Sequence, residues 1–135
     1  MTPVAQENVR KIDAAGGIVA LGTDQSIGPA VHRELELLVG GGISPMNAIR
    51  IATLNSARFL GKDRDMGSVE EGKMADVVLL SADPLTDINN TKQIDTVIKA
   101  GQIIDRSKLD LSVNRKAAAT GRAPMLIYPI EDALE

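Results

Sequence analysis

The 135-residue sequence contains no cysteine and no tryptophan, and Phe59 and Tyr128 are its only aromatic rings. Without cysteine, disulfide bonds and thiolate metal sites are excluded. With so few rings, the core must be built from aliphatic side chains and methionine. The hydrophobic fraction of 44% is nevertheless normal for a globular protein.

Signals for nucleic-acid and membrane partners are also missing. The net charge is −3 and charges of both signs are spread along the chain, so no basic patch marks a nucleic-acid surface. No apolar run approaches the roughly 20 residues of a membrane span. Residues 1–4 lack the basic and apolar regions of a signal peptide. These absences predict a soluble cytoplasmic protein without nucleic-acid or membrane partners.

Three helices are predicted from the spacing of apolar residues and from stop signals, at residues 3–15, 29–40 and 45–60. Thr2 and Ser44 each precede a proline and are suited to cap the first and third helices. The glycine triplet at residues 40–42 ends the second helix. It resembles a phosphate-binding loop, but no Lys-Ser/Thr pair follows it, so the helix stop is the better interpretation.

Four strands are predicted, at residues 18–21, 75–80, 94–99 and 102–105. The first is apolar on both faces, which is typical of a buried parallel strand. Alone it would have unpaired edges, and unpaired edges invite pairing with another chain. The others form a small all-β unit with a hairpin turn at residues 100–101, and residues 67–69 are a candidate short strand. Helices around a buried strand favour α/β architecture.

Asp24 is the main candidate for chemistry. It follows the apolar run 18–21 and the stop at Gly22. A side chain at the carboxyl end of a parallel barrel strand points into the mouth of the barrel, where active sites of that fold lie. A carboxylate there can bind a metal or accept a proton from metal-bound water. The alternative is a turn aspartate that caps the next helix, and spacing alone favours this alternative.

Other polar residues have simpler interpretations. His32, near its helix start, is either a solvated or locally hydrogen-bonded imidazole or a residue at a barrel mouth that touches substrate. Asn55, in an otherwise apolar helix, is interpreted as a buried amide that ties down a loop. Asp76 is expected to pair or hydrogen-bond at a strand start. The charged residues at 70–73 are interpreted as a solvated turn.

Four segments, in order and suitably spaced, resemble the C-terminal end of the metal-dependent amidohydrolase family, especially its imidazolonepropionase-like and prolidase-like members. They are Gly22-Thr23-Asp24 and residues 44–61, 67–79 and 97–102. A complete (β/α)8 barrel needs roughly 250 residues, so the chain is too short to be one. The resemblance therefore implies an α/β fold made of the C-terminal portion of a (β/α)8 amidohydrolase barrel followed by part of a small β-sandwich.

The resemblance also divides the chain. Residues 1–61 correspond to the last βα units of the barrel and residues 62–106 to the β-sandwich portion. Residues 107–135 form a C-terminal tail that does not match the family. The same resemblance identifies residues 97–102 as the last hairpin of the β-sandwich.

The chemistry that the resemblance implies is hydrolysis of an amide or related C–N bond by water that a divalent metal, zinc in the complete enzyme, activates. Asp24 matches the aspartate that binds metal and carries a proton from water to the leaving nitrogen. The other family ligands are a His-x-His pair and further histidines, whereas His32 is the only histidine here. Catalytic zinc usually has three protein ligands, so the isolated chain is predicted to be inactive and to lack a metal cofactor.

Two functions from different classes stay open. In the first, the chain is the C-terminal part of an amidohydrolase whose site is completed by a larger assembly or a longer parent chain. Its partners would be other copies in a homo-oligomer or a complementary barrel fragment, and only the complete site would bind a small amide or dipeptide. In the second, the chain is a non-catalytic structural or interaction domain derived from an amidohydrolase.

Overall fold

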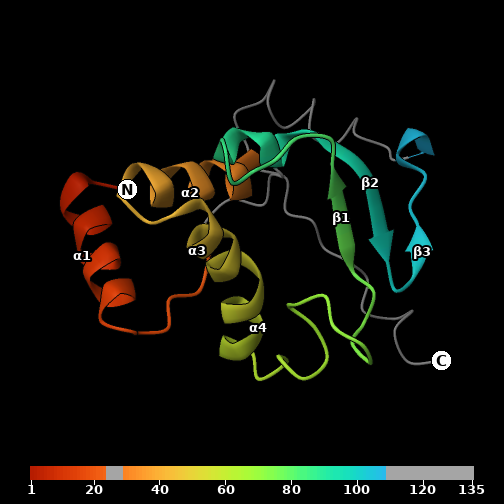
Figure 1. Cartoon of the computed structure of the whole chain (residues 1–135), viewed down its shortest axis with the longest axis horizontal. Helices are drawn as coiled ribbons and strands as arrows, with labels where there is room; N and C mark the ends of the chain where they lie inside the picture. Colours follow the sequence, from red (N-terminus) through yellow and green to blue (C-terminus); the bar gives the residue numbers. More distant parts are fainter. Residues whose placement is uncertain (24–28, 109–135) are drawn as a thin grey trace, which may run out of the picture.

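A helical part precedes a small β part in the chain, and the two lie on opposite sides of the molecule (Figure 1). The computed structural model describes residues 1–23 and 29–108. In chain order the elements are α1 (Pro3–Ala14), α2 (Pro29–Gly40), α3 (Pro45–Arg50), the π-helix η1 (Ile51–Asn55), α4 (Ser56–Phe59), β1 (Val77–Leu80), the 3-10 helix η2 (Ile88–Lys92), β2 (Ile94–Lys99), β3 (Gln102–Ile103) and the 3-10 helix η3 (Arg106–Lys108).

The three predicted helices are confirmed, together with their caps. Thr2 Oγ1 accepts a hydrogen bond of 3.3 Å from the backbone N–H of Ala5, and Ser44 Oγ accepts one of 3.3 Å from that of Asn47. Each bond satisfies an N–H group that has no partner inside its helix. The helix predicted at 45–60 is one continuous helical run, but a π-helical turn separates α3 from α4.

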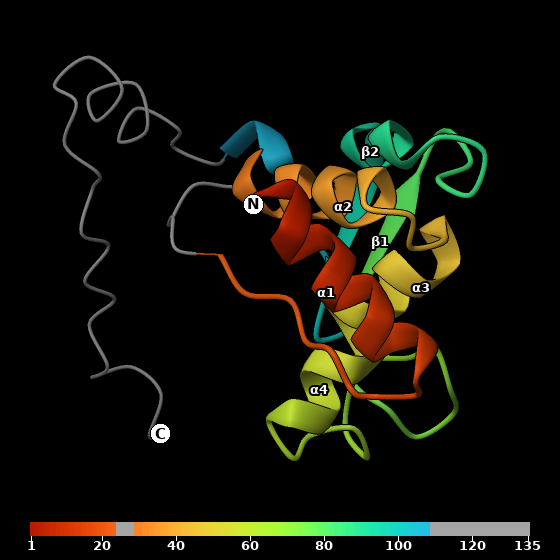
Figure 2. The same ribbon diagram turned by 90° about the vertical axis from the view of Figure 1, so that its left-hand side faces the viewer.

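The hydrophobic core lies between α2, α3 and η1. Its buried members are Leu35, Leu38, Ile43, Ala48, Ile51 and Ile88. As the composition required, every one of them is aliphatic. α1 lies across α2 and α3 (Figure 2) and contributes the partly buried Val9. Two side-chain bonds hold α1 in place, from Gln6 Nε2 to the carbonyl of Leu37 at 2.8 Å and from Asn47 Nδ2 to Asp13 Oδ2 at 3.1 Å.

The β part is an antiparallel three-stranded sheet in the order β1-β2-β3. Val77, Ile98 and Ile103 lie side by side across the three strands, so their side chains share one face. The strands predicted at 75–80, 94–99 and 102–105 are therefore confirmed, although the first and last are shorter than expected. Ala100 and Gly101 form the hairpin turn with positive φ values of 50° and 80°.

The strand predicted at residues 18–21 is wrong. This segment belongs to no strand, and the described residues provide no neighbouring strand for it. A β-strand is defined by hydrogen bonds to a second strand, so an apolar run without a neighbour stays irregular. Val19 and Leu21 pack against the core, whereas Ile18 is 65% exposed. Residues 67–69 form no strand either, and Gly67 turns the chain with φ of 95°.

The division at residue 61 stays a prediction, although every helix of α type precedes it and every strand follows it among residues 1–23 and 29–108. No helix in these ranges is long and apolar enough to cross a membrane.

Candidate functional site

Asp24 lies outside the described residues, so its predicted roles as catalytic residue and metal ligand stay predictions. The structure does describe both flanks of residues 24–28. The chain is described up to Thr23, and it is described again from Pro29, where α2 begins. How these flanks are held is therefore the structural information that bears on the site.

A hydrogen bond to the helical run helps to hold the segment that precedes Asp24. The backbone N–H of Leu21 donates to Ser56 Oγ at 3.1 Å. The same hydroxyl donates to the carbonyl oxygen of Ile51 at 2.8 Å. Leu21 also packs against the core through its side chain. Sequence reasoning did not identify Ser56, because nothing in a local pattern indicates a contact across 35 residues.

The helix that follows residues 24–28 is held through His32. Its Nδ1 lies 3.0 Å from Thr91 Oγ1, and that hydroxyl donates its single proton to the carbonyl of Ile88 at 2.8 Å. With the Thr91 proton on the Ile88 carbonyl, the hydrogen-bond network assigns the tautomer in which Nδ1 carries the hydrogen and donates to Thr91. For the Nδ1 atom of His32, the structure thus agrees with the interpretation of a hydrogen-bonded imidazole. The predicted contact between His32 and substrate stays a prediction.

One turn further along α2, Glu36 forms a second link to η2. Its Oε1 accepts from Lys92 Nζ and its Oε2 accepts from Arg33 Nη1 at 2.8 Å. The hydrogen bond from Lys92, followed by that from Arg33, lowers the pKa of the Glu36 carboxyl. The buried Ile88 adds an apolar contact between η2 and the core. α2 is thereby attached to the connection between β1 and β2.

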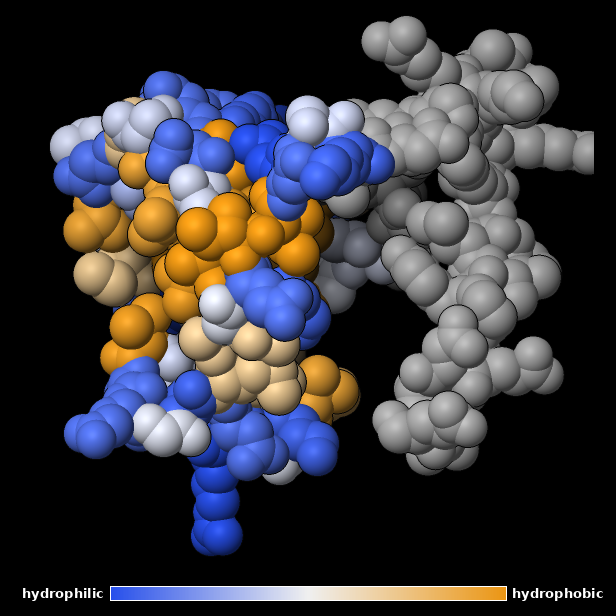
Figure 3. All heavy atoms as spheres, turned by 90° about the vertical axis from the view of Figure 1, so that its right-hand side faces the viewer, coloured by the Kyte–Doolittle hydropathy of each residue, from blue (hydrophilic) through white to orange (hydrophobic). Residues whose placement is uncertain are grey.

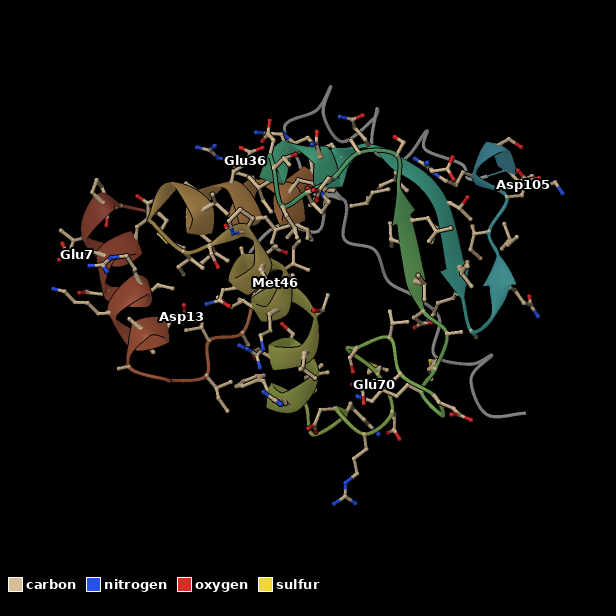
Figure 4. All side chains as sticks on the ribbon, in the orientation of Figure 1. Glu7, Asp13, Glu36, Met46, Glu70 and Asp105 are labelled. Carbon is tan, nitrogen blue, oxygen red and sulfur yellow. The ribbon has the colours of Figure 1, made fainter. Side chains whose placement is uncertain are left out.

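The charged residues at 70–73 were predicted to form a solvated turn, and the structure confirms this for Glu70 but not for Lys73. Glu70, labelled in Figure 4, is 60% exposed at its side chain, but Lys73 is only 12% exposed. Lys73 Nζ donates to Ser68 Oγ at 2.6 Å and to Glu70 Oε1 at 3.2 Å. A covered lysine needs such partners. The solvated turn is therefore wrong for Lys73, because the fold of the loop covers its side chain.

Asp76 hydrogen-bonds at the start of the β part, as predicted. Its Oδ1 accepts from the backbone N–H of Ala100 at 2.7 Å, and its Oδ2 accepts from Lys99 Nζ. The Lys99 hydrogen bond, followed by that of Ala100, lowers the pKa of the Asp76 carboxyl. Asp76 therefore supports a hairpin turn in which a non-glycine residue has positive φ.

Asn55 is buried as expected, with 8% exposure.

Because the pKa of Asp76 is lower in the folded state, its stabilising contribution is complete above its unfolded pKa of about 3.9. The contribution is lost as the pH falls through the folded pKa. We expect Asp76→Asn to lower the thermal midpoint at pH 7, and the gap to the wild type to narrow below pH 4. Thermal unfolding at several pH values, with the exposed Asp95→Asn as a charge-matched control, measures this. A difference in thermal midpoint that does not change with pH would contradict the assignment of this stabilisation to the ionised Asp76 carboxylate.

The described residues do not fit a catalytic metal site on their own. Within 1–23 and 29–108, no group of three or more His, Cys, Asp or Glu side chains is placed to hold a metal ion. The single histidine of the chain uses its Nδ1 in the bond to Thr91. Any catalytic metal therefore needs ligands in addition to those of this part of the chain.

Comparison with known proteins confirms the resemblance to the amidohydrolase family. The model of the amidohydrolase family matches residues 4–104. An imidazolonepropionase from Geobacillus sp. (strain WCH70) is 35% identical over 114 residues, which cover 74% of this chain and 26% of that protein. The structure of molinate hydrolase superposes with a TM-score of 0.71 at 32% identity, covering 77% of this chain and 27% of that one.

A Xaa-Pro dipeptidase, solved with methionine bound in its active site, superposes with a TM-score of 0.66 at 32% identity. The match covers 73% of this chain and 25% of the dipeptidase. The chain thus belongs to the amidohydrolase family. It spans about a quarter of the length of these relatives. The family as a whole is built on the TIM barrel and is generally metal-dependent.

Proposed function

We propose that this chain is the C-terminal part of a metal-dependent amidohydrolase that hydrolyses an amide or another C–N bond. The observation that carries the proposal is the family match over residues 4–104, which includes the Gly22-Thr23-Asp24 motif. Proteins similar to this chain include molinate hydrolase and phenylurea hydrolase B. Asp24 is the residue that this chain contributes to metal binding and proton transfer. His32, close to it in sequence, is the candidate for contact with substrate.

The complete site needs histidines from outside this chain. The family chemistry uses water activated by a divalent metal, and zinc is the metal that we propose for the complete enzyme. Catalytic zinc usually has three protein ligands and an open position for water. One aspartate and one histidine cannot provide that set. The chain alone is therefore expected to bind no stoichiometric zinc and to be inactive.

Exposed apolar surface supports association with a partner. Figure 3 looks at the side of the molecule that carries the sheet, and hydrophobic side chains gather over the middle of this face. The exposed apolar side chains of the sheet are Leu79 and Ile103, on the face that also carries Val77 and Ile98, and Val78 on the opposite face. At the end of the helical run, Phe59 and Leu60 are 79% and 67% exposed. Such surfaces mark interaction sites in soluble proteins.

A complementary barrel fragment, either in the same polypeptide or in a separate one, would both cover the exposed apolar surface and complete the metal site. It would supply strands beside residues 18–21 and also the missing histidines. A homo-oligomer would cover the same apolar surface, but each further copy would add only one histidine, its own His32, to the available metal ligands. Small amides or dipeptides are the proposed substrates of the complete site.

Two observations favour a different function, that of a non-catalytic structural or interaction domain. The chain has a single histidine, and its described residues contain no metal-binding cluster. Such a domain would fold and bind a partner without any hydrolysis. The two functions differ in whether activity appears once the rest of a barrel is present.

The test compares the purified chain with the chain assembled with an N-terminal amidohydrolase segment that carries the His-x-His pair. We expect zinc by mass spectrometry, and turnover in a screen of dipeptides and lactams, only in the assembly. An assembly that forms and binds zinc but hydrolyses nothing would favour the non-catalytic function. One tightly bound zinc per isolated chain, with turnover, would show that the fragment interpretation is wrong.

A further inference from the structure

The two edges of the three-stranded sheet differ in how they are protected. β3 forms one edge and is only two residues long, and charged residues follow it at positions 105, 106 and 108. Short strands and charged side chains are the usual protection of an exposed edge. β1 forms the other edge, and its four residues are all aliphatic, without charge, glycine or proline. The β1 edge therefore lacks the protection that the β3 edge has.

The backbone bonds of the sheet show which groups of β1 point to its open side. Val97 in β2 accepts a hydrogen bond of 2.8 Å from the N–H of Ile104, so its backbone groups face β3. Its partner in β1 is Val78, whose backbone groups therefore face away from β2. Ser81 donates at 2.9 Å to the residue that precedes β2, so its neighbour Leu80 faces away as well. In the described part of the chain, these outward groups of Val78 and Leu80 have no hydrogen-bond partner.

The one irregularity in the pairing of β1 with β2 leaves the open edge intact. The register shifts between Leu79 and Leu80, whose partners are positions 96 and 94 of β2. The extra residue is Asp95 in β2, and β1 itself has no insertion. The side chains of Val78 and Leu79, which point to opposite faces, are 51% and 47% exposed. Both the backbone and the side chains of this edge are therefore incompletely covered.

The direction in which the edge faces limits what can pair with it. In Figure 1, β1 is the strand of the sheet nearest to the helical part, so its open side faces the helices. A second copy of the chain would bring its own β2, β3 and helices together with its β1. The joined sheet would then continue into the space of the first copy's helical part. A single extended segment requires only the spacing of one strand, about 4.8 Å.

We propose that the complementary barrel fragment contributes one extended segment that pairs with the open edge of β1 and becomes a fourth strand of this sheet. Its backbone satisfies the outward groups of Val78 and Leu80, and aliphatic side chains on its two faces cover Val78 and Leu79. In strand addition of this kind, main-chain hydrogen bonds give affinity and alternate side chains give specificity. The inference rests on the partner named in the proposed function, but it requires no hydrolysis.

Amide hydrogen exchange, followed by NMR, tests the pairing without an assay of activity. In the purified chain, the amides of Val78 and Leu80 are expected to be unprotected, whereas that of Leu79, which faces β2, is protected. In the assembly with the N-terminal amidohydrolase segment, exchange at Val78 and Leu80 should slow at least about tenfold, because amides in a ladder exchange only through opening. An assembly that forms without this change overturns the proposal. Protection of both amides in the purified chain also overturns it, and a dimer in sedimentation would then assign the edge to a second copy.

A proline variant isolates the outward N–H of Val78. Proline is tolerated on an edge strand where its nitrogen faces away from the ladder. Val78→Pro should therefore keep the circular dichroism spectrum of the wild type and weaken binding of the N-terminal segment about tenfold, as the loss of a hydrogen bond predicts. Val78→Ala is the matched control, because it shortens the side chain but keeps the N–H, and it should weaken binding less.

A proline variant that binds as tightly as the alanine variant would contradict the pairing. An assembly that protects Val78 and Leu80 but hydrolyses nothing supports the pairing and contradicts only the proposed catalysis. An active assembly in which both amides stay unprotected contradicts only the pairing. The absence of any assembly contradicts the pairing and the proposed partner together.

Discussion

Asp24→Asn is expected to lower the hydrolytic rate of the assembled enzyme by roughly 10²- to 10⁴-fold, the range that one acid–base group contributes. Asparagine has nearly the same size as aspartate, so the fold should persist. Its amide cannot take up a proton at neutral pH and is a weaker ligand for a divalent cation than a carboxylate. The measurement is kcat and kcat/KM of the assembly for a dipeptide or lactam that it hydrolyses.

Two controls make this result specific to the position. Asp95→Asn removes the same charge from an exposed site on β2 and should leave kcat unchanged. The circular dichroism spectrum of Asp24→Asn should match that of the wild type. An active Asp24→Asn assembly would show that Asp24 is a turn aspartate, which is the interpretation that spacing alone favours.

Gly67→Ala is expected to reduce the free energy of unfolding by about 2–5 kcal/mol. A left-handed backbone costs a non-glycine residue about 1–2 kcal/mol, and Gly67 has φ of 95°. The added methyl group would also meet Ala57 Cβ at 2.6 Å and Leu54 Cα at 3.0 Å. Forcing extra atoms into a packed contact adds about 1–3 kcal/mol. Urea unfolding of both proteins measures the difference.

Gly72→Ala is the matched control, because Gly72 has a similar φ of 84° but nothing within 4 Å of its ideal Cβ. Only the backbone cost of about 1–2 kcal/mol applies to it. The excess loss in Gly67→Ala therefore measures the contact between the loop and the helical run. Equal losses in both variants would show that this contact does not constrain η1.

These experiments separate two properties of the chain. The Gly67 and Gly72 variants report whether the junction between the helical and β parts is as tight as its geometry indicates. The Asp24 variant reports whether the chain contributes a catalytic residue to an assembled enzyme. A protein that keeps the first property and lacks the second would be the non-catalytic domain that a single histidine favours.

The sequence by itself determined most of the local structure. Pro3 and Pro45 with their caps set the helix starts, and glycines set the stops, because caps and turns depend on residues a few positions apart. The alternation in β2 and the turn at Ala100 and Gly101 predicted the hairpin for the same reason. The ordered motifs also identified the family and singled out Asp24, since the motifs are contiguous in the chain.

Only the tertiary structure decided how the flanks of Asp24 are held. The bond between Leu21 and Ser56 joins residues 35 apart, and that between His32 and Thr91 joins residues 59 apart. Local propensity is silent about such pairs, because they depend on how the whole chain packs. The π turn was missed for a related reason, since it shifts the helical register by one residue within the same apolar pattern.

The prediction of a strand at residues 18–21 failed because strand formation also depends on tertiary structure. Its apolar, partly β-branched run is typical of a buried strand, so its own residues favour extended structure. Strand formation, however, also requires hydrogen-bonding neighbours. The described residues provide none, and a serine hydroxyl binds the Leu21 amide instead. The sequence determined which segment can be a strand, whereas the neighbours present in the folded molecule decided that it is not one.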